Sequence, residues 1–545
     1  MHRSLVVMVL VTVHGGACGS SSPVGDVRFA NQPPVWRVND RIDTPKAPEE
    51  KPFDRGLYHF DSYYKVADRS VALTRERRSL GVNALDEVPD STWFTNRIGV
   101  REVSTAEIKC GAGTCDPPDA HFPWTIKSGK EGGTAVGFIV EDARGVKFLL
   151  KFDQTHAPEV ETGADVIVAR LLWAAGFNVP DDHIVHFKPS DLKLDPKAYY
   201  KHLGAKRKLD QQRVDSQLAK FSRGKDVRMR GLATVFVEGK PLGGTQRLGV
   251  RTGDPNDVIP HELRRDLRGQ AAIFAWLSHT DMKEDNSHDA WIEDPKDKKV
   301  HYVRHFLIDF GNSLGAQARV RQRPYLGYQY DVDFAEMGMS LISLGAHRQP
   351  WEGRIDPPLK GVGLYAVDDY LPSKWKSNTF AHFPMIEADR FDNYWGSKIA
   401  ARFTREQIAA AVESAQFSDP RAATYLTEAI LGRARKTAQF WFRRVNPIDN
   451  FKVEGATLCF TDLALLYELE RAPTKFRVAA HDANGTVVGA RQELVPDSAG
   501  RACAAVPAVQ YAILRVESTR SMPGTLLHVA RDGAGALRLV GVWRL

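Results

Sequence analysis

Five residues in two short segments have the types and spacing that phosphoryl transfer to a hydroxyl group requires. Asp281 offers a carboxylate that can orient the attacking hydroxyl and accept its proton, and Lys283 can lie near the transferred phosphate. Asn286 and Asp309 offer the oxygen atoms that magnesium prefers. His279 begins the first segment, and we expect it to brace the loop.

The segment between these two groups of residues predicts a β-hairpin. Residues 291–293 form the outgoing strand, residues 294–297 the turn, and residues 300–308 the returning strand. An antiparallel return brings Asn286 and Asp309 to the same end of the hairpin. The sequence therefore places both expected metal ligands together.

Residues 122–152 predict three strands joined by glycine-containing turns. Lys151 ends the third strand and is the expected phosphate-binding lysine, with Lys147 on the same face as the second choice. The first turn could let backbone N–H groups approach phosphates, although an ordinary hairpin turn explains it equally well; its glycines are Gly129, Gly132 and Gly133.

A helix is predicted over residues 160–175, because apolar residues recur there at spacings of three and four and Gly176 follows. The helix should offer an acid that holds the lysine. Asp165 in its middle and Glu161 one turn earlier are the candidates. Exposed surface charge is the alternative interpretation of either acid.

With these motifs in the order His279-x-Asp281-x-Lys283-x-x-Asn286 and then Asp309-Phe-Gly, the chain resembles an atypical member of the protein-kinase-like superfamily. It is similar to HipA-type, phosphoinositide and secreted Golgi-type kinases over roughly residues 122–445. The resemblance implies a bilobal α+β fold, with an N-lobe at 122–245 and a C-lobe at 246–447. It also implies ATP with Mg²⁺ or Mn²⁺ as cofactors.

Three functions follow as alternatives. The first is an ATP- and metal-dependent phosphoryl or nucleotidyl transferase whose acceptor is unknown. The second is a catalytically inactive kinase-fold binding protein that binds something else, so retained binding of ATP and magnesium would separate the first function from the second. The third is a metal-dependent hydrolase, which tight zinc binding would favour and which would use His279, Asp281, His288, His301 and His305.

The N-terminus predicts an export signal over residues 1–18. Arg3 precedes the apolar run 5–13, and small residues lead to Cys18. The pattern resembles a bacterial lipobox, so we expect a lipid on Cys18 that anchors the protein to a membrane outside the cytoplasm. Plain secretion is the alternative. The formal charge of +7 gives no reason to expect a nucleic-acid partner.

The four other cysteines predict two disulfides, which suits an exported chain. Cys110 lies near Cys115, and Cys459 and Cys503 share the C-terminal segment. Four buried free thiols are the alternative. A zinc site is less expected, because the chain has no Cys-x-x-Cys pair.

The remaining chain divides by composition. Residues 19–52 predict a flexible tether, and residues 53–121 form an N-terminal extension without a predicted role. The basic stretch 195–230 predicts a solvated helical insertion or, alternatively, a docking surface for an acidic partner. Helices are also predicted at 261–278 and as a pair over 404–443. Short β-like runs after residue 450, including 486–490, predict a β-sandwich-like domain.

Overall fold

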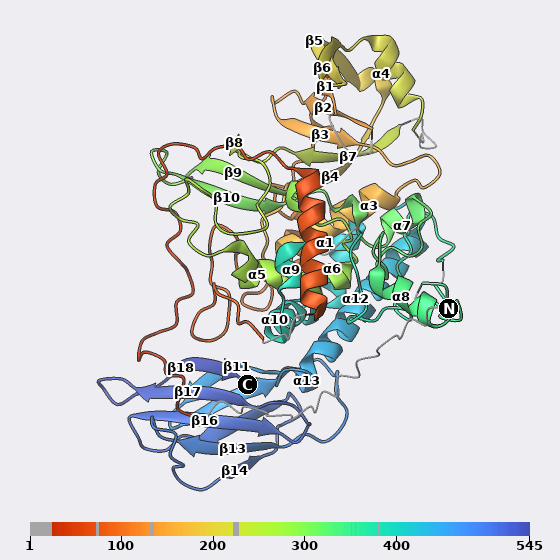
Figure 1. Cartoon of the computed structure of the whole chain (residues 1–545). Coiled ribbons are helices and arrows are strands. Elements are labelled where there is room, and N and C mark those ends of the chain that lie inside the picture. The colour runs from red at the N-terminus through yellow and green to blue at the C-terminus, as the bar shows by residue number, and fades with distance from the viewer. Residues whose placement is uncertain are drawn as a thin grey trace, which may run out of the picture.

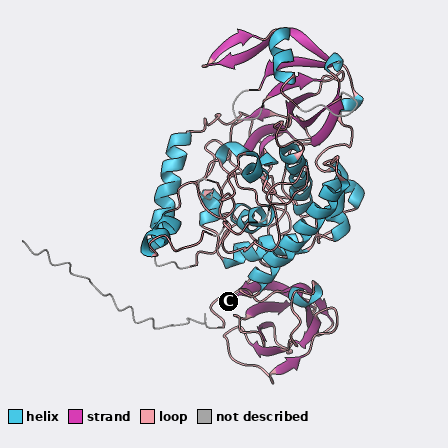
Figure 2. Ribbon diagram, turned by 90° about the vertical axis from the view of Figure 1, so that its right-hand side faces the viewer, coloured by secondary structure: helices cyan, strands magenta, loops and turns pink. Residues whose placement is uncertain are grey.

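The structure is a computed structural model that describes residues 24–71, 76–130, 136–221, 228–349, 351–354, 356–378 and 382–545. It is a mixed α/β protein with several sheets (Figure 1). A seven-stranded sheet lies at one end, a helical body occupies the middle, and a β-sandwich lies at the other end, as the rotated view of Figure 2 also shows.

The seven-stranded sheet has the strand order β4-β7-β3-β2-β1-β5-β6. Phe138, Phe148 and Leu150 are fully buried in its core, which explains the apolar runs of the sequence. Its strands are β1 (Trp124–Gly129), β2 (Gly137–Glu141), β3 (Lys147–Lys151), β4 (Asp182–Phe187), β5 (Leu192–His202), β6 (Ala205–Lys208) and β7 (Met229–Val235).

The expectation of a helical insertion at 195–230 is wrong for most of its length. Strands β5 and β6 form a hairpin there, and only α4 (Gln211–Leu218) is helical among the described residues. The reason is register: Leu192 and Leu194 on β5 pair in parallel with Trp124 and Ile126 on β1. Lys193 lies between these two leucines, and the alternation of apolar and polar residues over 192–195 is that of a strand.

Helix α3 (Val160–Ala175) follows β3 and ends at Gly176, as the sequence predicts. Almost every residue of α3 is buried, because the helix lies between the sheet and the helical body. The body contains α5 (Arg265–Arg268), α6 (Gln270–Leu277), α10 (Arg390–Ala401), α11 (Arg405–Glu413) and α12 (Pro420–Phe442). Asp419 caps α12 by accepting from the Arg421 N–H, which explains the helix break seen in the sequence.

The predicted hairpin is present as β9 (Ser287–Glu293) and β10 (His301–Leu307), with β8 (Lys240–Pro241) beside β9. Its register pairs Ser287 with Leu307. Three short helices follow the hairpin along the chain: α7 (Ala316–Val320), α8 (Phe334–Ile342) and α9 (Phe383–Ile386).

The C-terminal sandwich packs a three-stranded sheet against a five-stranded one around a shared apolar core. The predicted strand at 486–490 is wrong: only Val487 pairs, in an isolated bridge with His481, because Gly485 and Gly489 both adopt positive φ. The three-stranded sheet contains β11 (Ile448–Glu454), β12 (Thr457–Asp462) and β15 (Arg501–Ala505), and α13 (Leu463–Leu466) follows β12. The other sheet contains β13 (Phe476–His481), β14 (Gln492–Leu494), β16 (Tyr511–Ser518), β17 (Thr525–Arg531) and β18 (Leu537–Arg544).

Both disulfides expected from the sequence are present. Cys110 bonds to Cys115 at the end of α2 (Thr105–Cys110), and Cys459 bonds to Cys503 between the paired strands β12 and β15. Such bridges are compatible with an exported protein. In the described part of the chain, no helix is long and apolar enough to cross a membrane.

The described part of the expected tether, residues 24–52, runs along the surface and contacts two units. Phe29 packs against His528 of the sandwich, and the Thr44 N–H donates to the His301 carbonyl of the hairpin. Helix α1 (Arg55–Val71) then crosses the helical body (Figure 1). The predicted signal and Cys18 lie outside the described residues.

Candidate active site

A cleft of about 580 Å³ lies between the seven-stranded sheet and the helical body. Seven residues selected from the sequence line this cleft, although they come from five different elements or loops. They are Lys151, Glu161, Asp165, Asp281, Lys283, Asn286 and Asp309.

Lys151 lies at the centre of the cleft and joins two carboxylates. Its Nζ is 3.1 Å from Asp165 Oδ2 on α3 and 2.9 Å from Asp309 Oδ1 beyond β10. Burial disfavours the ammonium, but the Asp165 and Asp309 carboxylates outweigh burial and raise the pKa of Lys151. The lysine is therefore charged and held in position for an anionic group.

Of the two candidate acids, Asp165 pairs with Lys151, whereas Glu161 does not pair with it. The Asp165 side chain is buried, and its Oδ1 also accepts a 3.0 Å hydrogen bond from the Phe310 N–H. Glu161 lies elsewhere on the cleft wall, where burial raises its pKa to about 7. The runner-up Lys147 is exposed at the far end of β3.

Asp309 occupies an unusual backbone conformation, with φ 64° and ψ 66°. A left-handed residue other than glycine costs free energy, and such residues concentrate at functional sites. The Asp309 side chain remains 48% exposed to the cleft. The Lys151 ammonium lowers the pKa of Asp309 to about 2, so the carboxylate is ionised and open to a cation.

Asp281 lies across the cleft and is oriented by two donors. Lys283 Nζ is 3.0 Å from Asp281 Oδ2, and Asn312 Nδ2 donates to the same oxygen at 2.9 Å. The other carboxylate oxygen, Oδ1, is left to receive a proton from a substrate hydroxyl. The arrangement suits a general base with a fixed direction.

Asn286 connects this loop to the hairpin. The side-chain Nδ2 of Asn286 donates to the backbone carbonyl of Asp281. The backbone carbonyl of Asn286 accepts from the Ile308 N–H at 3.1 Å. The first bond uses the amide nitrogen, so the side-chain oxygen is the atom that can bind a metal. The antiparallel register places Asn286 and Asp309 at one end of the hairpin, as predicted.

His279 does not line the cleft. It is buried between the rings of Phe274 and Phe310, and its Nδ1 lies 2.9 Å from Ser313 Oγ. Burial lowers the pKa of His279 to about 4, so the imidazole is neutral. Its place is that of a brace for the loop.

Of the three glycines in the first turn, only Gly129 is described. It ends β1 opposite Phe138 and does not line the cleft. Gly132 and Gly133 lie outside the described residues.

Sequence reasoning missed several residues of the cleft. Asn312 directly follows the Asp-Phe-Gly motif, and its proximity to that motif could have singled it out. Arg55 and His59 come from α1, and Arg321 follows α7. No local pattern connects these three positions to the motifs, because only the tertiary fold brings them to the cleft.

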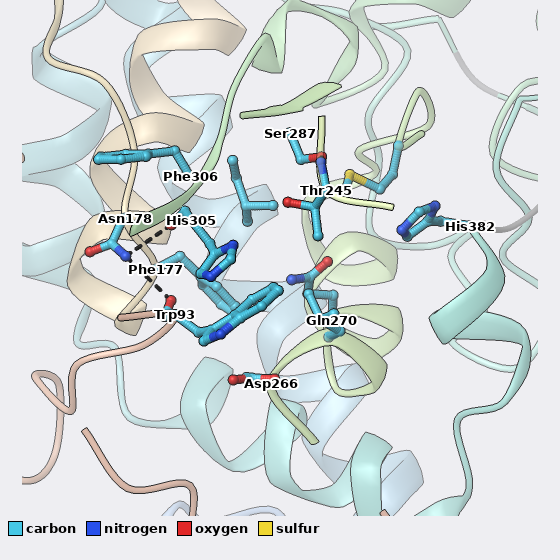
Figure 3. Close-up of a pocket in the computed structure, with 13 residues that line it drawn as sticks. Trp93, Phe177, Asn178, Thr245, Asp266, Gln270, Ser287, His305, Phe306 and His382 are labelled. Carbon is cyan, nitrogen blue, oxygen red and sulfur yellow. Dashed lines mark hydrogen bonds between the residues drawn. The ribbon is translucent and has the colours of Figure 1, made fainter. Parts of the chain in front are cut away.

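The histidines expected for a hydrolase do not converge on one site. His305 lies flat against Trp93 in a small pocket (Figure 3). Its Nδ1 is 2.7 Å from Oδ1 of buried Asp289. That pocket has about 20 Å³, which suits one water rather than a substrate. His301 stacks on Trp291, and His279 lies beside Ser313.

The cleft fits a hard divalent cation better than zinc. Asp309 and Asn286 present carboxylate and amide oxygens, the donors that Mg²⁺ and Mn²⁺ accept. Elsewhere in the described chain, one group of potential zinc ligands gathers, Glu454 with Cys459 and Cys503, but both cysteines are committed to a disulfide. The hydrolase alternative thus has no assembled metal site among the described residues.

Comparison with known proteins identifies no family. No protein-family model matches the chain, and a search of curated proteins finds no match. The geometry of the site is therefore the basis for inferring the function.

Proposed function

We propose that the protein is a kinase-like phosphoryl or nucleotidyl transferase that uses ATP and Mg²⁺ or Mn²⁺. The supporting observation is convergence: Lys151, Asp165, Asp281, Asn286 and Asp309 are up to 158 residues apart along the chain, yet all line one cleft. In this proposal the seven-stranded sheet and α3 belong to the N-lobe, and the helical body is the C-lobe of a bilobal kinase-like fold.

Each side chain has a separate task in the proposed reaction. Bound metal would neutralise charge on the phosphates, and the oxygens of Asp309 and Asn286 would hold it. Lys151, fixed by Asp165, would bind phosphate oxygens. Asp281 would orient the acceptor hydroxyl and take its proton, while Lys283 would lie beside the transferred group.

A kinase-fold protein that binds nucleotide without transfer is one form of the catalytically inactive alternative. Both functions require the Lys151 cluster, but only transfer requires the ordered Asp281 carboxylate. Its two donors, Lys283 and Asn312, favour transfer, because a binding protein has no need to hold that carboxylate in one direction.

Nucleotide binding tests the proposal directly. Calorimetric titration with ATP and Mg²⁺ or Mn²⁺ should show binding, and Lys151→Met should abolish it. Lys147→Met is the matched control, because Lys147 is exposed on the same strand. This variant should bind ATP as the wild type does. Absence of nucleotide binding with either metal contradicts the proposal, and loss only in Lys147→Met would reassign the lysine.

We also propose that the protein is an exported lipoprotein anchored through Cys18. The disulfides are compatible with export, and the signal pattern supports the anchor. Mass spectrometry of the native protein should find an acylated N-terminus at Cys18. An intact Met1 contradicts it.

A further inference from the structure

Helix α8 is built with its apolar residues toward solvent. None of its residues is buried, while Phe334, Leu341 and Ile342 are 66%, 77% and 80% exposed. Leu344, just beyond the helix, is 93% exposed. A surface helix normally turns its apolar stripe inward, so this arrangement is the reverse of the usual one.

Polar contacts hold α8 against the protein. Asp333 caps its N-terminus by accepting from the Glu336 N–H, and Lys376 pairs with the same Asp333 carboxylate. Glu336 lies 2.9 Å from His347 Nε2, on the segment that follows the helix. The inward face therefore makes polar contacts, while Leu341, Ile342 and Leu344 on the outward side remain largely exposed.

Helix α1 repeats the pattern beside α8. Phe60 and Tyr64 are 69% and 68% exposed, whereas Tyr58 and Ser62 face inward and are buried. Tyr63 of α1 contacts Phe334 of α8, with ring centroids 6.4 Å apart. The two helices, labelled in Figure 1, thus share one apolar surface. We call this the α1–α8 surface and define it by Phe60, Tyr64, Phe334, Met337, Leu341, Ile342 and Leu344.

The α1–α8 surface borders the candidate active site. Arg55 and His59 of α1 line the cleft, as do Arg323 and Asp331 just before α8. Arg323 is 44% exposed, and Arg348, a few residues past α8, is also exposed. A ligand that covered this surface would carry apolar groups outside the cleft and could place an anionic or hydroxylated group at the arginines.

We propose that the α1–α8 surface docks on lipid and that the acceptor is a hydroxyl on a lipid head group. Side chains this exposed protrude rather than line a groove, which suits insertion into the interface of a bilayer. The arginines at the edge complement anionic head groups. This proposal rests on the proposed transferase function, because it names the acceptor of that site.

The transfer step balances with no further reactant. The head-group oxygen forms a bond to the γ-phosphorus as the bond from that phosphorus to the β-phosphate bridge oxygen breaks. The hydroxyl proton goes to Asp281, and ADP carries away the bonding electron pair. Lipid phosphate monoester and ADP are the products.

Flotation with vesicles tests the docking. The chain from residue 19 keeps every described residue and lacks the signal and the lipid, so vesicle binding must come from the protein surface. It should float with phosphatidylcholine vesicles containing phosphatidylglycerol, and less with phosphatidylcholine alone. Leu344→Glu should lower the partition constant at least about tenfold, the effect of withdrawing one buried leucine.

Leu203 provides a closely matched control. It is 92% exposed at the tip of the β5–β6 hairpin and has φ 51°, against 93% and φ 52° for Leu344, and a glycine follows each leucine. Leu203→Glu should leave flotation within about twofold of the original. Arg348→Gln should remove the preference for phosphatidylglycerol.

Several results would overturn the lipid proposal. The first is no flotation with either vesicle, and the second is an equal loss of flotation for Leu344→Glu and Leu203→Glu. The third is a dimer in light scattering that Leu344→Glu dissociates, because such a dimer would assign the surface to a second copy of the chain. Nucleotide titration on the same samples separates the two proposals. ATP binding without flotation rejects lipid docking alone, whereas flotation without ATP binding rejects the transferase function and the lipid acceptor with it, leaving only the docking surface.

Discussion

Comparing Asp309→Asn with Asp281→Asn separates nucleotide binding from catalysis. In the proposed reaction Asp309 holds the metal and nucleotide, whereas Asp281 acts on the acceptor hydroxyl. Asp309→Asn removes the charge that we propose to bind the metal but keeps the shape of the side chain. Lys151 retains its 3.1 Å contact with buried Asp165, and the repulsion between two carboxylates disappears. Since the Asp309 side chain is 48% exposed, we expect the free energy of unfolding measured without nucleotide to change by no more than about 1 kcal/mol.

The expected effect of Asp309→Asn on the binding of ATP with metal is larger than its effect on the free energy of unfolding. Removing a residue that only hydrogen-bonds to a metal ligand lowers metal affinity by about 10- to 100-fold, so removing a direct ligand should lower it by at least about 100-fold. At a concentration of one hundred dissociation constants, ATP with metal should stabilise the wild type by about 2.7 kcal/mol. The same concentration should stabilise Asp309→Asn by only about 0.4 kcal/mol.

Asp281→Asn is the control for this experiment. It should retain the full nucleotide-dependent stabilisation and lose turnover by about 100- to 10,000-fold, because its carboxylate acts on the acceptor. Thermal unfolding with and without ATP and Mn²⁺ measures both variants. Equal stabilisation of wild type and Asp309→Asn would place the nucleotide elsewhere, and loss of binding in Asp281→Asn would refute the division of tasks.

Three further predictions concern orientation, redox state and pH. Asn312→Ala should lower turnover but leave nucleotide affinity nearly intact, because Asn312 orients Asp281 by a 2.9 Å hydrogen bond; steady-state kinetics and titration measure both. Cys503→Ala should destabilise the sandwich by about 2–4 kcal/mol in denaturant unfolding under oxidising conditions, and an unchanged midpoint would refute the disulfide. Burial alone would raise the pKa of Asp449, but the positive charges of Lys398, Arg544 and Arg402 together outweigh burial and lower it to about 2, so about 2–3 kcal/mol of stability present above pH 4 should be lost towards pH 2. Lys398→Met should remove the largest part of this pH dependence, because Lys398 Nζ also lies 2.7 Å from the Asp449 carboxylate.

Local patterns predicted much of the cleft. The hairpin from Ser287 to Leu307 follows from strand alternation around a polar turn, and its register places Asn286 and Asp309 at one end. Helix α3 follows from its apolar spacing and Gly176. These elements depend on contacts close in sequence, which is why single-sequence reasoning could find them.

Contacts distant in sequence were beyond that reasoning. Residues 195–208 form a strand hairpin because β5 pairs with β1, some seventy residues earlier, and the lysines gave no sign of that pairing. The choice between Asp165 and Glu161 depends on how α3 is rotated against β3. The approach of Arg55 and His59 to the cleft likewise depends on the path of α1 across the helical body.

Asp165 shows why the motifs alone could not define the site. Its two oxygens hold different parts of the protein: Oδ2 binds Lys151 at the end of β3, and Oδ1 accepts from the Phe310 N–H beside Asp309. One buried carboxylate therefore holds Lys151 and the backbone next to Asp309 at the same time. Burial raises the pKa of Asp165, and the Lys151 ammonium opposes that shift. Each residue of the pair thus favours the charged form of the other, and both line the cleft.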